Sequence, residues 1–330
     1  MSRYYQSGRT FPVNKYKKLQ ERKFFFTMYE QLWWSPAWQK LTPIAQNLFF
    51  AMLSEARFTF DKKKIHKSNN TNFYYWNPEQ NIIDENCLED VDIIINLAGS
   101  PIAQLWTKNA KKSILDSRLS SVKLLENLIF KDKNNKVKQF ACASAIGIYP
   151  SNINIEFDEK SKHISDSFLG NTVNKWEESC NNIENSNIKL LKLRIGLVLS
   201  NEGGLLKPIA LSVKFFLGVW FGKGNNYYSW IHIDDITQSI MYLIDNNKEG
   251  IYNLVAPKPI TSKTFVTQIA DTLKTKIILP SIPKKIVLFF SGKMSELLIF
   301  NQRVCSKKLV SEGYKFKYTD LKLALENLLK

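Results

Sequence analysis

Apolar runs and amphipathic segments alternate along the chain from residue 91 onward. Residues 91–99 form a β-branched run that ends in a small-residue turn, which is typical of a buried parallel strand. Apolar residues then recur at helical spacing over 107–130 and predict a helix. The alternation continues with strands predicted at 137–144 and 188–199 and a helix at 168–182. Repeated units of this length predict a doubly wound α/β protein with a parallel sheet.

The loops after these three strands are the first candidates for a functional site. Ligands of open parallel sheets bind at the carboxyl ends of the strands. Each of these loops combines glycine with small or polar residues, which allow a ligand to approach the backbone closely. Their sequences are Asn96-Leu97-Ala98-Gly99-Ser100, Ser144-Ala145-Ile146-Gly147-Ile148-Tyr149 and Arg194-Ile195-Gly196-Leu197-Val198-Leu199-Ser200.

These loops, together with other motifs, resemble the epimerase-type atypical short-chain dehydrogenase/reductases, in the branch that ends in its own small C-terminal domain. The further motifs are Asp116-Ser117-Arg118, Ser229-Trp230-Ile231-His232-Ile233-Asp234-Asp235 and Gly313-Tyr314-Lys315-Phe316-Lys317-Tyr318. The resemblance implies a Rossmann-like NAD(P)-binding domain at 61–279 and a small C-terminal helical domain at 280–330. It implies an NAD(P)-dependent oxidoreductase or epimerase-like protein with NADP or NAD as cofactor and a small-molecule substrate.

The resemblance also implies roles for individual residues. Ser144 matches the catalytic serine of the extended members, where it works with a tyrosine and a lysine; a turn serine is the alternative. The loop Asn96, Leu97, Ala98 and Gly99 is expected to bind the cofactor. Arg194 is expected either to face a cofactor phosphate or substrate carboxylate, or to form a buried ion pair.

The expected Tyr-x-x-x-Lys pair is missing from the helix that follows Ser144. Residues 168–178 contain no tyrosine, and Lys175 alone fits a solvated helix lysine. Tyr149 is a possible substitute, although its Ile-Tyr-Pro turn more often marks packing. This departure agrees with the atypical branch and argues against ordinary carbonyl–alcohol redox chemistry.

The N-terminal 60 residues do not resemble the family. A family member opens with a strand and a glycine-rich turn that cradles the cofactor pyrophosphate, yet this chain has no glycine between Gly8 and Gly99. We therefore predict impaired dinucleotide binding. Residues 23–29 are predicted to replace the missing first strand, with a helix from Pro43 to residue 56 behind it and a second strand at 57–60.

Other interpretations of the N-terminus remain open. The segment Trp33-Trp34-Ser35-Pro36-Ala37-Trp38 weakly resembles the opening of helix-turn-helix modules, and a reading-frame chimera would explain a foreign segment of this kind. Residues 1–67 carry 13 Lys and Arg against 4 Asp and Glu, so much of the chain's net charge of +16 lies there. A solvated basic surface is favoured over nucleic-acid binding. A non-catalytic binding protein that has kept the fold is the alternative to an enzyme.

Composition narrows the class of protein further. The 330 residues are 44% hydrophobic, which suits a globular chain rather than a disordered one. The four cysteines lie far apart without a CxxC pair, and no apolar run is long enough to span a bilayer. We therefore expect a cytoplasmic protein without a membrane segment. No metal is predicted, because His232, Asp234 and Asp235 fit a structural turn in which an aspartate caps a helix.

Overall fold

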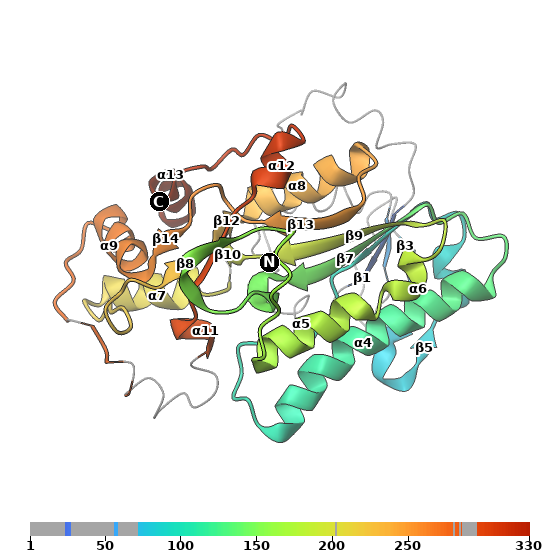
Figure 1. The fold of residues 1–330 in the computed structure, drawn as a ribbon, viewed down its shortest axis with the longest axis horizontal. Helices are drawn as coiled ribbons and strands as arrows, with labels where there is room; N and C mark the ends of the chain where they lie inside the picture. Colours follow the sequence, from blue (N-terminus) through green and yellow to red (C-terminus); the bar gives the residue numbers. More distant parts are fainter. Residues whose placement is uncertain are drawn as a thin grey trace, which may run out of the picture.

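A computed structural model gives a central parallel sheet with helices on both faces (Figure 1). It describes residues 24–27, 56–58, 72–201, 203–279, 281–283, 285 and 296–330. Within these residues the sheet has seven strands in the order β13-β9-β7-β6-β1-β2-β3, all parallel. The strands are β1 Phe24–Thr27, β2 Ala56–Phe58, β3 Asn72–Phe73, β6 Ile93–Asn96, β7 Gln139–Ala145, β9 Lys189–Ile195 and β13 Gly250–Leu254. The predicted doubly wound α/β fold is confirmed.

The three strands predicted from apolar runs lie side by side at the centre of the sheet. Ile94 of β6 pairs with Phe140 of β7, and Phe140 pairs with Leu190 of β9. All three side chains are buried, as expected for strands covered on both faces. From β1 the strand order runs outward to β2 and β3 on one side and to β6, β7, β9 and β13 on the other. The change of direction between β1 and β6 makes a topological switch point.

The N-terminal segment supplies the first strand, as predicted for residues 23–29. β1 pairs with β6 from Phe24↔Ile93 to Thr27↔Asn96, and its other edge pairs with β2. The second predicted strand, at 57–60, corresponds to β2. The predicted helix from Pro43 to residue 56, the tryptophan-rich segment and most of the basic residues 1–67 lie outside the described residues.

Two helices cover one face of the sheet. They are α4 Lys108–Lys131 and α5 Phe168–Glu178. Each begins at a side-chain cap: Thr107 Oγ1 accepts a hydrogen bond from the Ala110 N–H at 3.2 Å, and Ser167 Oγ accepts one from the Gly170 N–H at 3.1 Å. α5 ends before residue 182, where its prediction placed the end, and a short helix, α6 Asn181–Glu184, follows.

The opposite face is covered by α8 Ile233–Asp245. Its buried residues Ile236, Ile240 and Ile244 are spaced four apart and form one apolar stripe. This stripe packs in one cluster with Leu191 and Leu193 of β9. The sheet is therefore buried on both faces, and its strand ends are the accessible places for a ligand.

The predicted strand at 188–199 is two strands. β9 ends at Ile195, and after Gly196 the chain continues as β10 Leu197–Leu199, which leaves the central sheet and pairs in parallel with β12 Trp230–His232. A Cβ at Gly196 would lie 2.5 Å from the Ser229 carbonyl oxygen, so only glycine fits this crossing. Residues 188–199 form one mostly apolar run in the sequence, so the break at Gly196 could not be predicted from it.

The C-terminal residues return to the body of the molecule in two places. β15 Gln302–Val304 pairs with β8 Asn152–Phe157, and α13 Leu321–Leu329 packs in one cluster with α7 Leu206–Lys214 and α9 Ser262–Thr272. The remaining elements are β4 Trp76–Asn77, η2 Pro78–Gln80, β5 Ile82–Ile83, η3 Glu85–Leu88, η4 Ile146–Ile148, β11 Tyr227–Tyr228, β14 Ile260–Thr261, α11 Glu296–Ile299 and α12 Lys307–Ser311. No helix within the described part of the chain is long and apolar enough to cross a membrane.

Candidate functional site

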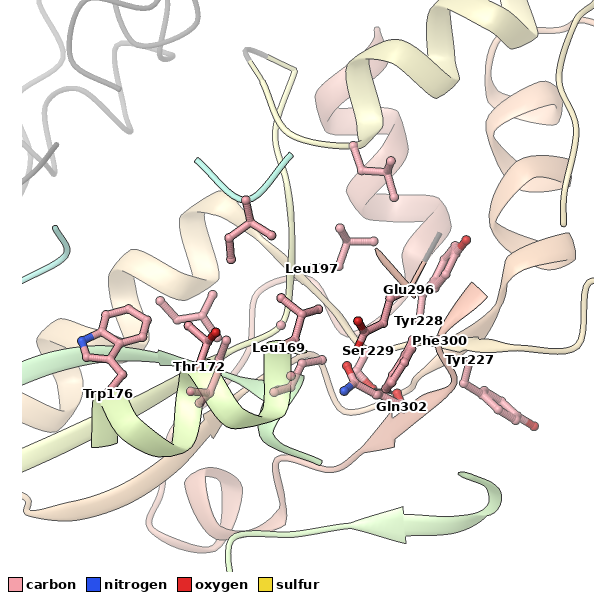
Figure 2. Close-up of a pocket in the computed structure, with 18 of the residues that line it drawn as sticks. Leu169, Thr172, Trp176, Leu197, Tyr227, Tyr228, Ser229, Glu296, Phe300 and Gln302 are labelled. Carbon is pink, nitrogen blue, oxygen red and sulfur yellow. Dashed lines mark hydrogen bonds between the residues drawn. The ribbon is translucent and has the colours of Figure 1, made fainter. Parts of the chain in front are cut away.

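A cleft lies at the carboxyl ends of β7 and β9, between α5 and the C-terminal segment around α11 (Figure 2). Its accessible volume is about 180 Å³. The loops after both strands contribute to its wall, as does β11. The lining residues are Ile102, Arg118, Ala145, Ile146, Gly147, Leu169, Thr172, Val173, Trp176, Ile195, Gly196, Leu197, Leu205, Tyr227, Tyr228, Ser229, Glu296, Phe300 and Gln302.

The α5 wall of the cleft is mostly apolar, and α5 contains no tyrosine. Leu169 and Val173 both line the cleft and have the same i, i+4 spacing as a Tyr-x-x-x-Lys pair. They lie against Gly147, where a Cβ would be 3.5 Å from the Leu169 Cβ. The structure therefore supplies no tyrosine–lysine relay at this position.

Arg118 of α4 brings a positive charge to the cleft. Its side chain is 6% exposed, and its NH1 donates hydrogen bonds to the carbonyl oxygens of Ile114 at 2.8 Å and Ser100 at 3.2 Å. The guanidinium lies over the ring of Trp176, 5.0 Å from its centroid. Burial lowers the pKa of Arg118 to about 10, which still leaves it charged at neutral pH.

Glu296 of α11 brings a carboxylate to the same cleft (Figure 2). Burial raises the pKa of this carboxyl above its usual value, although a hydrogen bond with Ser167 and the charge of Lys111 oppose the shift. Its Oε1 is buried without a hydrogen-bond partner in the described structure. Within the described residues, the ionisable side chains that line the cleft are Arg118, Tyr227, Tyr228 and Glu296.

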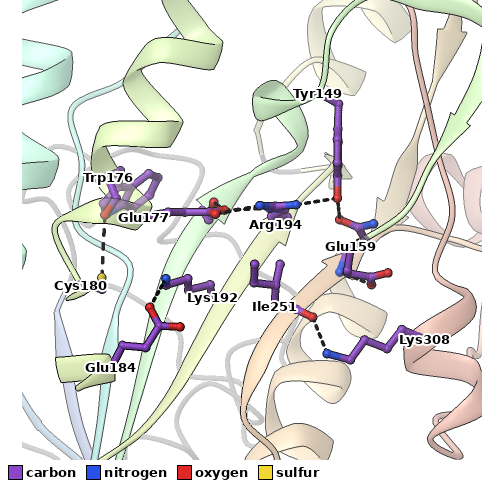
Figure 3. Close-up of polar contacts among 12 residues, drawn as sticks. Tyr149, Glu159, Trp176, Glu177, Cys180, Glu184, Lys192, Arg194, Ile251 and Lys308 are labelled. Atoms are coloured by element: carbon purple, nitrogen blue, oxygen red, sulfur yellow. Dashed lines mark hydrogen bonds and ion pairs between the residues drawn. The ribbon is translucent and has the colours of Figure 1, made fainter. Parts of the chain in front are cut away.

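Ser144 and Arg194, two of the predicted site residues, both bind Glu177 in a buried polar network. Figure 3 shows Arg194 between Glu177 and Tyr149. Ser144 and Arg194 are paired in register on β7 and β9. Arg194 binds both carboxylate oxygens of Glu177 at 2.8 Å, and Ser144 Oγ donates to Glu177 Oε1 at 2.5 Å. Burial works against the charge on Arg194, but Glu177 outweighs it, so the pKa of Arg194 is raised. Of the two roles predicted for Arg194, the structure therefore shows the buried ion pair.

Tyr149 completes the network. Its hydroxyl donates to Asn253 Oδ1 at 2.8 Å and accepts a hydrogen bond from Arg194 NH1 at 2.9 Å. Burial raises the pKa of Tyr149 to about 12, although the charge of Arg194 opposes this shift, so the phenol is neutral at physiological pH. Neither Tyr149 nor Ser144 nor Arg194 is among the residues that line the cleft.

The predicted cofactor loop, Asn96 to Gly99, follows β6 directly. Asn96 is fully buried; its Oδ1 accepts a hydrogen bond from the Ala98 N–H at 3.1 Å, and its Nδ2 donates to Ser121 Oγ. Gly99 lies against Arg118, where a Cβ would be 3.0 Å from the guanidinium carbon. The loop is thus held rigidly beside the end of β1, where the switch point predicts a ligand.

The turn at His232 differs in detail from its prediction. The cap of α8 is His232, whose Nδ1 accepts a hydrogen bond from the Asp234 N–H at 3.0 Å, and not an aspartate. Asp235 instead accepts hydrogen bonds from the backbone N–H groups of Lys317 and Tyr318, both at 2.8 Å. Its carboxylate is therefore committed to holding the C-terminal segment. The described residues contain no cluster of His, Cys, Asp and Glu that could hold a metal ion.

Sequence reasoning missed the two charged residues of the cleft. Leu115 and Leu119 of α4 are apolar but only half-buried, and Arg118 takes the inward position. Its spacing of four from the buried Val122 was a signal that it faces inward. Glu296 follows a segment outside the described residues, and no local pattern distinguishes it from a surface glutamate.

The chain is similar to several known proteins. An epimerase family protein of Staphylococcus aureus is 33% identical over 280 residues, which cover 84% of this chain and 92% of the relative. A related epimerase family protein of Staphylococcus epidermidis is 34% identical over 242 residues, or 73% of this chain and 80% of the relative. Residues 282–328 match a domain of unknown function, DUF1731.

Solved structures show the same fold. The human epimerase family protein, solved with NADPH, superposes with a TM-score of 0.76 at 23% identity and covers 92% of this chain and 98% of its own. A nucleoside-diphosphate sugar epimerase from Corynebacterium glutamicum has a TM-score of 0.70 at 21% identity, covering 96% of this chain and 62% of that one. These solved structures show the fold, and the identity to the staphylococcal proteins over most of both chains shows that the chain belongs to the epimerase family.

Proposed function

We propose that the chain binds a nicotinamide dinucleotide, NADP or NAD, over the carboxyl ends of β6, β7 and β9 and acts as an epimerase-like oxidoreductase on a small molecule in the cleft. The observation that carries this proposal is the position of the cleft at the strand ends of a doubly wound sheet, where such folds bind their ligands. The human relative solved with NADPH supports the choice of cofactor.

The residues present fit one half of such a cofactor better than the other. The rigid loop Asn96 to Gly99 and the open cleft beyond it suit the nicotinamide end. The segment between β1 and β2 contains no glycine to form the tight turn that cradles a pyrophosphate at a helix N-terminus. We therefore expect the dinucleotide to bind, but weakly.

Proton transfer in the cleft does not fall to a tyrosine–lysine pair on α5. With Leu169 and Val173 on the α5 wall, Glu296 is the lining residue suited to general acid–base chemistry. Burial raises its pKa above the usual value, and one of its oxygens has no hydrogen-bond partner among the described residues. Ser144 would act indirectly, by orienting Glu177 and with it Arg194.

Calorimetric titration of the full chain with NADPH and with NADH tests the proposal. We expect saturable binding that is weaker than micromolar. The variant Leu169→Trp, which fills the cleft, should abolish it, whereas Leu323→Trp on the exposed side of α13 should not. Micromolar or tighter binding would contradict the loss of the phosphate cradle. No binding at millimolar dinucleotide would leave a non-catalytic protein as the better description.

A further inference from the structure

The two buried arginines of the described structure are treated very differently. Arg194 has its charge balanced by the bidentate carboxylate of Glu177. Arg118 is equally buried, yet no carboxylate among the described residues forms an ion pair with it, and burial is the cause of its lowered pKa. The carboxylate of Glu296, which also lines the cleft, does not contribute to the pKa of Arg118. An unbalanced buried cation is costly, so its retention needs an explanation.

The guanidinium of Arg118 is held on one side and free on the other. NH1 is fixed by two backbone carbonyl groups, those of Ile114 and Ser100, and the ring of Trp176 packs against the plane. Nε and NH2 make no hydrogen bond to the protein within the described residues. These two atoms form the edge of the fork that binds carboxylates and phosphates through two parallel hydrogen bonds. The arginine is therefore preorganised for an oxyanion that the described residues do not supply.

The rest of the cleft indicates what kind of molecule carries that oxyanion. Most of the described wall is apolar and comes from α5, from the loops after β7 and β9, and from the C-terminal segment at Phe300. Ligand sites of this kind bury an apolar body and use a few polar groups to fix its orientation. An accessible volume of about 180 Å³ suits a small molecule.

We propose that Arg118 is the anion-recognition residue of the cleft and that the cleft binds a small ligand with an apolar body and a terminal carboxylate or phosphate. This inference rests on the proposed function only in placing a small molecule in the same cleft. The oxyanion could come from a substrate or from the phosphate of the dinucleotide, and the two sources are separable by experiment.

The test uses the full chain and four probes at constant ionic strength. Sodium hexanoate presents a carboxylate on an apolar body, 1-hexanol presents the same body without charge, inorganic phosphate presents the oxyanion alone, and NADPH represents the cofactor. A ligand that binds only the folded state raises the thermal midpoint, so each variant is compared with its own ligand-free midpoint. A loss of stability in a variant therefore does not obscure its loss of binding.

The decisive variants are Arg118→Gln and Arg118→Lys, with Lys112→Gln as the matched control. Lys112 lies on the same helix but is exposed and paired with Asp116. We expect hexanoate to raise the midpoint of the wild type and of Lys112→Gln, and to bind Arg118→Gln about tenfold to a hundredfold more weakly. Arg118→Lys keeps the charge without the fork and should bind hexanoate with intermediate affinity. Arg118→Lys also tests the proposal if Arg118→Gln does not fold.

Each outcome decides the question. Equal responses of the wild type and the Arg118 variants to hexanoate, to phosphate and to NADPH would overturn the proposal, as would the absence of any response in the wild type. Arg118-dependent binding of hexanoate but not of NADPH would assign the oxyanion to a substrate, and the reverse result would assign it to the cofactor. Arg118-dependent hexanoate binding in a chain that never binds NADPH would sustain this inference while refuting the proposed function.

Discussion

At the scale of single residues, the ion pair between Arg194 and Glu177 shows why strand-end positions are predictable while their roles are not. Ser144 and Arg194 were candidates from the sequence because each lies at the carboxyl end of a predicted strand. It could not show that Glu177, on a helix between them, lies close enough to pair with Arg194. That contact depends on tertiary packing, and it decides between an anion-binding arginine and a structural one.

Removing the partner of Arg194 should therefore be costly. We expect Glu177→Gln to lower the free energy of unfolding by about 3–5 kcal/mol, because it leaves a guanidinium buried without a counter-charge. Urea denaturation followed by circular dichroism measures this. Glu178→Gln is the control: Glu178 is exposed, and among the described residues its side chain bonds only Asn174, so its loss should cost less than about 0.5 kcal/mol. Equal costs for the two variants would show that the pair contributes nothing.

Glu296 should reveal itself through the pH dependence of stability. Because burial raises its pKa in the folded state above the ordinary value of 4.5, the folded state holds this proton more tightly than the unfolded state. The wild type should therefore lose stability as pH rises through the window above 4.5, relative to Glu296→Gln, which cannot ionise.

The difference between the two proteins gives the test. The free energies of unfolding of the two proteins should coincide near pH 4. By pH 7.5 Glu296→Gln should be the more stable, by less than about 1 kcal/mol because solvent screens this half-buried group. Glu326→Gln on α13 is the control, because it removes a half-buried glutamate that lies outside the cleft. A wild type that gains stability over Glu296→Gln with rising pH would contradict the raised pKa.

At the scale of elements, periodicity correctly placed the strands and helices predicted from residue 91 onward, but not every break between them. The start of α4 was predictable to within a residue because Thr107 is a helix cap followed by an amphipathic run. The division of residues 188–199 into β9 and β10 was not, because both halves are apolar and the turn between them is a single glycine. Apolar patterns report burial, and a chain that passes from one buried sheet to another stays buried.

The glycine at that division should be intolerant of substitution. We expect Gly196→Ala to cost at least about 1–3 kcal/mol, because its Cβ would lie 2.5 Å from the Ser229 carbonyl oxygen and 2.6 Å from Val255 Cγ1. Gly147→Ala is the matched control: this glycine also lines the cleft, but its added Cβ would make only ordinary contacts at 3.5 Å and beyond. Chemical denaturation of both variants decides, and a Gly196→Ala protein as stable as Gly147→Ala would show that the crossing can relax.

At the scale of the whole molecule, the topology explains how an unfamiliar N-terminus can still complete a family fold. The sheet requires a strand between β6 and β2, and any apolar segment of suitable length meets that requirement through backbone hydrogen bonds, whatever its side chains. The glycine-rich turn is different, because it acts through its backbone conformation and a change of sequence removes it. This is why the strand position of residues 23–29 was predictable although its sequence does not match the family.

The same argument predicts that the N-terminal segment is indispensable for folding. Deleting residues 1–60 removes β1 and β2, so β6 loses its pairing along Ile93 to Asn96 and the centre of the sheet becomes an edge. The loss is comparable to the whole stability of a domain, about 5–15 kcal/mol. We expect the shortened chain to lack a cooperative thermal transition by circular dichroism and to aggregate.

A chain that starts at residue 22 keeps β1 and is the control, expected to retain the transition. The comparison separates the strand from the residues before it, because the two deletions differ in whether β6 keeps its neighbour. Limited proteolysis of the full chain provides an independent measurement. If protease removes residues 1–60 quickly and the remainder stays soluble with an unchanged cooperative transition, the segment is an appendage and β1 does not stabilise the sheet.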